Sequence, residues 1–325
     1  MTKRLGSFEL QVAWSPRARR LAILGPSGSG KSSVLKLLAG LERCDDGRIL
    51  LDGRDITRLD AAERGIAYVP QNYGLFPHLS VAEQLRFPLD ADPGLAALWL
   101  DRLGLRGLEQ RLPAGLSLGQ QQRVALARAF IRPARLLLLD EPFSALDAPL
   151  RARLRRDFLT LQQEIPATTI LVTHDPLEAA LLADEVLVLE QGRVLQSDTT
   201  EYIFRRPANE HAARLLGADN VTAGVVLDER HIAVGDGASL TVAGPPLMPG
   251  RRVGWSFHPS RAHVTRAGAY QGKVEAVFQM GAACQLAVRF GDAEIRVFDG
   301  ETASPPGAVC RFDIDPNAVQ VWPLD

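Results

Sequence analysis

The feature that most constrains the fold of this chain is a glycine-rich segment directly after a short apolar run. Residues 20–24 read RLAIL, the segment GPSGSGKSS follows at 25–33, and helical text continues as VLKLLAGL. The spacing G-x-x-x-x-G-K-S is that of a loop whose backbone amides close around phosphate groups at the start of a helix. In such a loop a lysine reaches the terminal phosphates and a hydroxyl can bind Mg²⁺, and Lys31 and Ser32 occupy these places. The sequence therefore predicts a nucleoside triphosphate site, with the binding residues Gly25, Pro26, Ser27, Gly28, Ser29, Gly30, Lys31, Ser32 and Ser33.

Further apolar runs alternate with helical text through the first two thirds of the chain. They read RLLLLDE at 135–141, TTILVTH at 168–174 and DEVLVLE at 184–190. Strands that are apolar on both faces and separated by helices indicate a mostly parallel sheet that is covered on both sides. Between about residues 79 and 130 the strand-like runs are replaced by text such as LAALWLDRLGL. We therefore expect an α/β fold, a P-loop NTPase core with a parallel-rich sheet and a helical insertion.

The last third of the chain has a different character. After about Asp219, short β-type runs such as VTAGVVL, CQLAVRF and AEIRVF are separated by Gly, Pro and Asp. Several short strands at close spacing predict a small all-β barrel or sandwich. A length of 325 residues with 46% hydrophobic residues also favours two domains. We place them at 1–216 and 217–325.

Composition argues against several classes of protein. The 37 basic and 38 acidic residues give a net charge of −1, which provides no field for steering nucleic acid or acidic lipid. The three cysteines are odd in number and widely spaced, so they predict neither a disulfide framework nor a zinc site. No apolar run approaches the length of a membrane span, and the first residues lack the apolar core of a signal peptide. We expect a cytosolic chain with no nucleic-acid partner.

An acidic pair, Asp140 and Glu141, ends the apolar run at 135–141. Taken alone, such a pair also fits a solvated strand end. With a phosphate loop in the same sheet, Asp140 lies at the edge where open α/β sheets bind their ligands, so it is a candidate for holding Mg²⁺. Glu141 is then placed to orient or deprotonate the water that attacks the terminal phosphate.

Three more segments carry polar residues whose meaning depends on context. His174 ends one strand-like run, and Gln71 follows another within YVPQNYG. Each also fits an ordinary surface position. Ser117 and Gln120 form a capping-box pattern at the start of a helix, in which Gly119 costs helix stability. The basic cluster at 151–157, RARLRRD, is interrupted by leucine at helical spacing and indicates a solvated helix face with an apolar back.

Taken in order, the phosphate loop, Gln71, LSLGQ, LLLLDE, SALD and His174 resemble the motifs of ATP-binding cassette (ABC) ATPases over about residues 1–216. The resemblance implies that Gln71 senses Mg²⁺ and the membrane partner, that Ser32, Gln71 and Asp140 hold Mg²⁺, and that His174 contacts the γ-phosphate of ATP. It makes Glu141, His174 and Gln71 the catalytic set. It also implies that a signature segment acts on the nucleotide of a second subunit, and this segment comprises Ser117, Leu118, Gly119 and Gln120.

Two positions depart from the usual pattern of the family. Leu118 replaces a glycine, and we expect its side chain to pack inward, because a leucine against triphosphate would desolvate charge without a hydrogen bond. The aromatic residue that stacks on adenine is not evident. Phe8 and Trp14 are candidates, although each also fits the hydrophobic core.

The resemblance extends to partners and to the C-terminal third. The text at 254–264, GWSFHPSRAHV, looks like the β-barrel regulatory domain of ATPases that serve binding-protein-dependent importers. This implies a head-to-tail dimer with two sandwiched ATP molecules beneath a transmembrane permease. It also implies indirect action through a periplasmic or extracellular substrate-binding protein, and a peripheral place on the cytoplasmic face of the inner membrane.

The substrate and two rival functions stay open. The text IFRRPANEHAARLLGADN favours the branch for molybdate, sulfate and related oxyanions, with iron, polyamine and sugar importers as alternatives. A soluble ABC ATPase acting on ribosomes or DNA is disfavoured by the single cassette, the absent basic patch and the C-terminal β text. A P-loop kinase is disfavoured by LSLGQQQ and by the pair Asp140 and Glu141.

Overall fold

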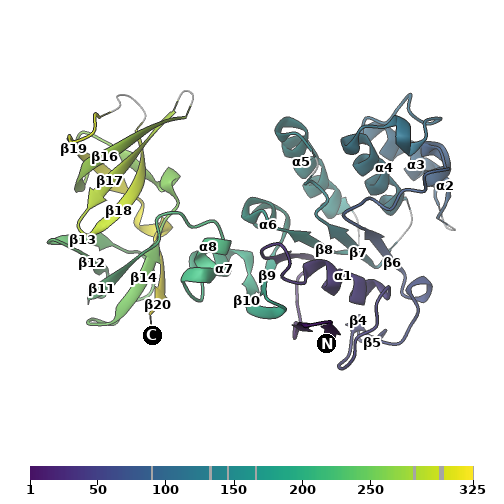
Figure 1. The fold of residues 1–325 in the computed structure, drawn as a ribbon, viewed down its shortest axis with the longest axis horizontal. Coiled ribbons are helices and arrows are strands. Elements are labelled where there is room, and N and C mark those ends of the chain that lie inside the picture. The colour runs from purple at the N-terminus through teal and green to yellow at the C-terminus, as the bar shows by residue number, and fades with distance from the viewer. Residues whose placement is uncertain are drawn as a thin grey trace. The chain divides into compact units, whose positions relative to one another are not determined.

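A computed structural model of the chain describes residues 1–88, 91–131, 134–144, 146–164, 167–280, 283–299 and 304–324. The chain divides into two compact units, Met1–Thr200 and Glu201–Asp325, and each is described by itself (Figure 1). The division lies before the expected domain boundary at 216/217, and that boundary stays a prediction. Within the described residues, no helix combines the length and the apolar character needed to cross a membrane.

The first unit is built on an eight-stranded sheet. In order across the sheet, its strands are β1 (Thr2–Leu5), β2 (Phe8–Gln11), β10 (Arg193–Thr199), β9 (Glu185–Glu190), β3 (Arg20–Leu24), β8 (Thr168–Thr173), β7 (Leu136–Asp140) and β6 (Ile66–Val69). The five strands from β9 to β6 run parallel, whereas β1 pairs antiparallel with β2 and β10 pairs antiparallel with β9. The predicted parallel-rich sheet is confirmed.

Helices cover both faces of this sheet. Successive residues of a strand point to opposite sides, so an apolar strand presents apolar side chains to a helix layer on each face. Along β7, Leu138 belongs to one buried cluster together with residues of α1 (Lys31–Ala39). Its neighbour Leu137 belongs to a second cluster, which includes residues of α5 (Ala148–Glu164). Burying each such leucine contributes roughly 1.5–3 kcal/mol. The two layers therefore fix the carboxyl end of β7, where Asp140 lies.

The helical insertion predicted for about residues 79–130 is confirmed. It consists of α2 (Val81–Arg86), α3 (Pro93–Arg102) and α4 (Leu118–Phe130). Each helix begins at a residue whose side chain accepts a hydrogen bond from a backbone amide of the first turn, and these residues are Ser80, Asp92 and Ser117. Such caps satisfy amides that have no partner inside the helix. The start of α4 is therefore well defined, although its glycine disfavours a helix.

Shorter elements complete the first unit. Helix α6 (Pro176–Leu182) follows β8, and β4 (Leu50–Leu51) pairs with β5 (Arg54–Asp55) in a separate hairpin. Two 3₁₀ turns lie at Ala61–Glu63 and Pro113–Gly115. Helix α6 packs against α5 and β8, so the chain that leaves β8 is held close to the carboxyl end of that strand.

The second unit contains more than the single barrel expected from the sequence. Two helices, α7 (Thr200–Arg205, whose first residue is the last of the first unit) and α8 (Glu210–Leu215), precede the strands. An open sheet has the order β13 (Ala238–Thr241), β12 (His231–Gly235), β11 (Thr222–Asp228), β14 (Arg252–Ser256) and β20 (Gln320–Pro323). A closed barrel has the order β15 (Ala262–Val264), β18 (Ala293–Asp299), β17 (Ala283–Phe290), β16 (Tyr270–Met280) and β19 (Val309–Ile314).

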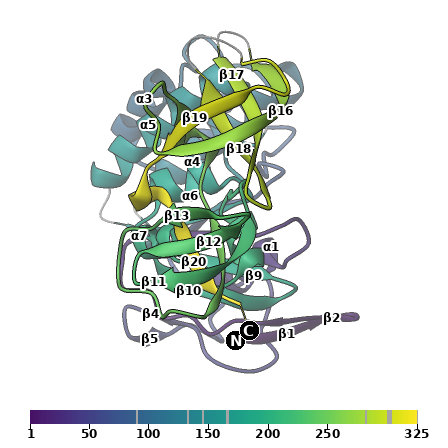
Figure 2. The same cartoon turned by 90° about the vertical axis from the view of Figure 1, so that its left-hand side faces the viewer.

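The open sheet and the barrel share one hydrophobic core. Trp255 lies on β14, and Phe257 directly follows this strand. Both are fully buried, in the same cluster as Phe312 of β19. Figure 2 shows both groups of strands facing the viewer. The predicted all-β barrel is therefore present. The alternation of short strands did not reveal that they divide into two sheets, because both sheets bury the same kind of apolar side chain. Two further 3₁₀ turns lie at Pro259–Arg261 and Pro316–Ala318.

Candidate active site

The phosphate loop runs from the end of β3 to the start of α1, and the side chain of its lysine bonds back to the loop backbone. Lys31 is 5% exposed, and its Nζ donates hydrogen bonds of 2.8 Å to the backbone oxygens of Gly25 and Pro26. Burial lowers the pKa of Lys31, although the negative charges of Glu141 and Asp140 act to raise it. The ammonium group is thus held inside the loop by neutral carbonyl groups, from which it can turn toward phosphate oxygens.

The helix start beside this lysine is open to an anion. Gly30 is the N-cap of α1 with φ of 99°, in the left-handed region that favours glycine, and it provides no side-chain acceptor for the first-turn amides. Ser29 is 2% exposed, and its hydroxyl has no hydrogen-bond partner among the residues that the structure describes. Ser27 and Gly28 are exposed on the loop, and Ser33 is half-buried in the first turn. These features fit the triphosphate predicted from the sequence.

Ser32 and Asp140 meet at the carboxyl end of the sheet. The Ser32 hydroxyl donates a hydrogen bond of 3.0 Å to Oδ1 of Asp140, and the Tyr68 hydroxyl donates one of 3.4 Å to Oδ2. Asp140 is 3% exposed, and burial raises its pKa although the bond from Ser32 lowers it. Burial likewise raises the pKa of Tyr68. A hydroxyl and a carboxylate that converge in this way are oxygen ligands of the kind Mg²⁺ prefers, so the donor set fits this ion.

Tyr68 is a site residue that the sequence interpretation missed. It lies on β6, beside β7, in register with Leu138. The available signal was its place three residues before Gln71, at the end of a strand-like run. Because Tyr68 and Asp140 are 72 residues apart, only the strand order brings them together.

Glu141 and His174 form the second pair at this edge. Nδ1 of His174 lies 3.2 Å from Oε1 of Glu141, and the side chains are 57% and 15% exposed. Glu141 has φ of 49°, which is uncommon for a residue with a side chain, while its amide donates to the Val172 oxygen of the neighbouring β8. Such backbone strain persists where the surrounding structure enforces it, and it is frequent at functional sites. The carboxylate is thereby turned out of the sheet toward His174.

Gln71 follows β6 after one proline and is exposed. Strand β6 pairs with β7 in parallel, and Val69 is in register with Leu139. Gln71 therefore leaves the sheet at the same edge as Asp140. The structure brings it to this side of the fold and leaves its amide accessible.

The signature segment begins helix α4 with its capping box in place. The Ser117 hydroxyl accepts a hydrogen bond from the Gln120 amide at 3.3 Å, and Gln120 Oε1 accepts one from the Ser117 amide at 2.9 Å. A β-carbon added at Gly119 would lie 3.1 Å from Cδ2 of Leu146. Close packing against Leu146 is therefore one reason for a glycine in this first turn.

The expectation that Leu118 packs inward is wrong. Its side chain is 63% exposed. In this first turn Gly119 packs against the buried Leu146, whereas the side chain of Leu118 is left toward solvent. Full burial along the helix begins only at Gln122.

The two aromatic candidates for adenine stacking both pack against the core on the α1 side of the sheet. The Phe8 ring lies next to the phosphate loop, with its Cζ 3.1 Å from the position of a β-carbon at Gly30. Trp14 lines a cavity of about 360 Å³, together with apolar residues such as Leu21 and Val34. Phe8 is therefore nearer to the loop, and its role in stacking stays a prediction.

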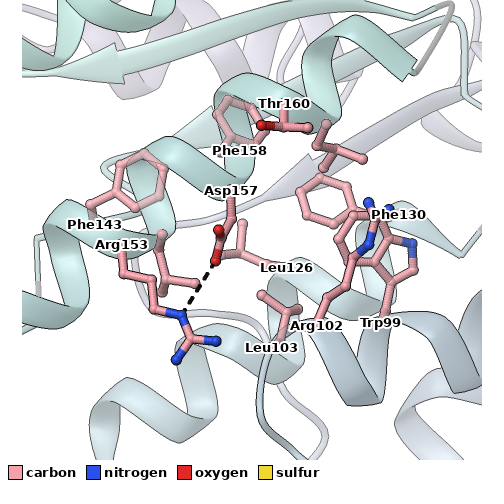
Figure 3. A pocket seen from close by; sticks show the side chains of 12 residues that line it. Trp99, Arg102, Leu103, Leu126, Phe130, Phe143, Arg153, Asp157, Phe158 and Thr160 are labelled. Carbon is pink, nitrogen blue, oxygen red and sulfur yellow. Dashed lines mark ion pairs between the residues drawn. The ribbon is translucent and has the colours of Figure 1, made fainter.

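A separate hollow lies between α3, α4 and α5 (Figure 3). Its volume is about 280 Å³, and buried aromatic side chains line it, among them Trp99, Phe130 and Phe158. Arg153 stands at the rim and pairs with Asp157 at 3.7 Å. The hollow contains no residue of the phosphate loop, so it is distinct from the nucleotide site.

The chain is similar in sequence to known proteins. A family model described as ABC transporter matches residues 14–144. The sulfate/thiosulfate import ATP-binding protein CysA of Nocardia farcinica is 38% identical over 308 residues, which cover 88% of each chain. The Fe(3+) ions import ATP-binding protein FbpC 1 of Rhizobium meliloti is 37% identical over 317 residues, covering 91% of this chain and 88% of the relative.

Solved structures show the same core fold. The dimeric post-hydrolysis structure of the ATP-binding cassette MJ0796, bound to ADP and Pi, aligns with a TM-score of 0.55 at 28% identity. It covers 61% of this chain and 95% of that chain. A second dimeric structure of the same cassette aligns equally well, at 29% identity.

Proposed function

Because this chain belongs to the ABC transporter family and is the ATPase subunit of an importer, we propose how its residues bind and hydrolyse ATP. The observation that carries the proposal is the meeting of the phosphate loop with Asp140 at the carboxyl end of the sheet, where Ser32 and Asp140 are hydrogen-bonded at 3.0 Å. ATP lies with its β- and γ-phosphates in the loop. The Lys31 ammonium exchanges the carbonyl oxygens of Gly25 and Pro26 for phosphate oxygens.

Ser32, Asp140 and Gln71 would hold Mg²⁺. When bound, the ion neutralises charge on the phosphate oxygens. The chain contributes two oxygen donors that already converge, from Ser32 and Asp140, and an exposed amide at the same edge of the sheet. Tyr68 fixes the second carboxylate oxygen of Asp140, which limits rotation of that side chain.

Glu141 acts as the general base for hydrolysis. Its partly exposed carboxylate leaves the sheet next to the Mg²⁺ residues, so a water molecule beside it faces the γ-phosphate. The carboxylate accepts a proton from this water as the water oxygen bonds to the γ-phosphorus. The bond between that phosphorus and the oxygen that bridges it to the β-phosphate breaks, so ADP leaves and inorganic phosphate is formed. His174 lies 3.2 Å from Glu141, where its ring can hold the base in place and contact the γ-phosphate.

A second copy of the chain completes each site. The signature segment, Ser117 to Gln120, starts a helix of 13 residues, and such an N-terminus attracts anions. We place it on the γ-phosphate of ATP bound by the other copy in a head-to-tail dimer. The dimeric structures of a related cassette support this arrangement. The exposed Leu118 then lies in the interface between the copies.

The dimer works beneath a transmembrane permease on the cytoplasmic face of the membrane. The import function of the two relatives supports this, because each is an ATP-binding protein of an import system. The permease receives substrate from a periplasmic or extracellular binding protein, so the contact of this chain with that protein is indirect. The second unit regulates and does not catalyse, since every residue of the nucleotide site lies before residue 200.

The transported substrate is an oxyanion of the sulfate or molybdate class. The sulfate/thiosulfate relative and the iron relative have nearly the same identity, so iron is the second candidate. A cell that lacks the chain should lose ATP-dependent uptake of labelled sulfate, thiosulfate or molybdate, and the intact gene should restore it. If uptake of labelled iron is lost instead, the substrate is iron.

Purified chain tests the catalytic proposal without the permease. It should release phosphate from ATP in a reaction that needs Mg²⁺. Replacement of Glu141 by glutamine should remove this activity and leave ATP binding intact. A Glu141→Gln protein with the wild-type rate would show that another residue is the base.

A further inference from the structure

Arg155 of α5 is the centre of a half-buried ion-pair cluster. Its Nη2 donates hydrogen bonds of 2.5 Å to Oδ2 of Asp175 and to Oε1 of Glu178, and its Nε donates one of 3.1 Å to the same Glu178 oxygen. The side chain of Arg155 is 14% exposed and that of Glu178 is 6% exposed. The expectation that the basic cluster 151–157 forms a solvated face is therefore wrong for Arg155, because α5 packs against α6 at this position.

The cluster holds both neighbours of His174. The Thr173 hydroxyl donates a hydrogen bond of 2.5 Å to Oε2 of Glu178 and accepts one of 3.0 Å from the Asp175 amide. Asp175 also caps α6, by accepting a bond of 2.8 Å from the Leu177 amide. The residues before and after His174 are thus fixed to one set of charged groups, whereas the histidine ring itself is exposed.

Electrostatics makes Arg155 the necessary member of this cluster. Two carboxylates, those of Asp175 and Glu178, lie within hydrogen-bond distance of one guanidinium group. Burial lowers the pKa of Arg155, but the hydrogen bonds and charges of Glu178 and Asp175 outweigh it and leave the pKa above its ordinary value. Without the arginine, the buried carboxylate of Glu178 would lose its counterion and would repel Asp175. The segment from Thr173 to Asp175 would then move or bind water.

We propose that Arg155 is a positioning residue for ATP hydrolysis. It places His174 beside Glu141 by holding Asp175 directly and Thr173 through Glu178. Arg155 contacts neither the nucleotide nor the reacting water. This inference depends on the roles of Glu141 and His174 proposed above. A displacement of about 1 Å in a catalytic group can lower a rate by as much as a hundredfold, so a small shift of this segment is sufficient.

The test compares Arg155→Met, Arg155→Lys and Arg153→Met. Methionine keeps the long side chain and removes the charge, lysine keeps the charge and loses the fork of donors, and Arg153 is an exposed arginine on the same helix. We expect Arg155→Met to lower kcat for ATP by about tenfold to a hundredfold, with KM within about threefold of wild type. Arg155→Lys should recover part of the loss, and Arg153→Met should keep the wild-type rate.

A double-mutant cycle with His174 separates positioning from a structural role. If Arg155 acts through His174, Arg155→Met should have little further effect on kcat in a His174→Ala protein. If the two losses multiply, or if Arg155→Met alone keeps the wild-type kcat, the proposal is wrong. A His174→Ala protein with wild-type activity would instead contradict the proposed role of His174, so the two failures can be distinguished.

Thr173→Val provides a second test in case Arg155→Met does not fold. It removes the hydroxyl that links the His174 segment to Glu178 and leaves the ion pairs in place. We expect a smaller fall in kcat, again with little change in KM and little further effect in the His174→Ala background. A wild-type kcat in Thr173→Val would overturn the link between this cluster and His174.

Discussion

The hydroxyl of Ser32 donates a hydrogen bond of 3.0 Å to the carboxylate of Asp140, which lies 108 residues further along the chain. This contact joins the first turn of α1 to the end of β7. Ser32 follows Lys31 of the phosphate loop, and Asp140 precedes the proposed base, Glu141. The contact therefore brings the phosphate loop close to the base. The proposed Mg²⁺ site forms only because this contact closes the two segments together.

Lys31→Ala should abolish ATP hydrolysis. The side chain is the only cation that the phosphate loop offers to the β- and γ-phosphates, and its loss also removes two hydrogen bonds that close the loop. We expect kcat/KM for ATP to fall by at least about a hundredfold. Phosphate release and nucleotide binding by the purified variant provide the measurement. Lys36→Ala, a half-exposed lysine on the same helix, should keep the wild-type activity.

Asp140→Asn should stabilise the nucleotide-free protein while it removes hydrolysis. Burial raises the pKa of Asp140, so the folded chain holds this proton more tightly than the unfolded chain. The free energy of unfolding therefore falls as pH rises from 3.8, the ordinary pKa of the group, to its raised pKa in the folded chain. Above that range the charged carboxylate destabilises the fold. We expect the Tm of Asp140→Asn at neutral pH to exceed that of the wild type by about 2 °C or more.

Thermal melting at two pH values checks the sign of this effect. The difference in Tm between Asp140→Asn and wild type should shrink at pH values below 3.8, where the carboxyl group is protonated in both states. Asp157→Asn, at an exposed position of α5, should change Tm by no more than about 1 °C. A lower Tm for Asp140→Asn at neutral pH would mean that its hydrogen bonds stabilise the charged form more than burial disfavours it.

Substitutions in the signature segment should separate stability from dimer formation. Leu118 is 63% exposed, so Leu118→Gly should change Tm by no more than about 2 °C, and it should change hydrolysis by less than tenfold. Ser117→Arg places a long side chain at the proposed contact with the partner's ATP and should block hydrolysis by steric bulk. ATPase rates and melting curves for both variants are the measurement. Cooperative hydrolysis by Ser117→Arg would rule out a site completed by the second copy.

The core of the fold could be predicted from the sequence because its signals are local. The phosphate loop lies between an apolar strand and a helix at 20–41, and the buried strands are continuous apolar runs such as the one that ends at Asp140. Both patterns are set by neighbouring residues. The site residues at strand ends could be found for the same reason, since parallel strands end at one edge of the sheet.

Leu118 and Arg155 could not be predicted in this way. The expectation for Leu118 followed from the cost of placing a leucine against triphosphate, and that argument does not show which residue of the first turn packs against the core. A basic cluster around Arg155 resembles a solvated surface, because its partner Glu178 is 23 residues away on another helix. Contacts of this kind follow from the packing of α5 against α6, and the composition of either helix alone does not contain them.

In the proposed mechanism, Glu141 is the base for ATP hydrolysis at a site that two copies of the chain share. Size-exclusion chromatography coupled to light scattering, on Glu141→Gln in saturating Mg²⁺-ATP, is the decisive measurement. We expect a stable dimer with two ATP molecules per dimer and no phosphate release. The same variant without nucleotide, and a Ser117→Arg, Glu141→Gln double variant, should be monomeric. A Glu141→Gln protein that binds ATP but stays monomeric, or that releases phosphate at the wild-type rate, would overturn the mechanism.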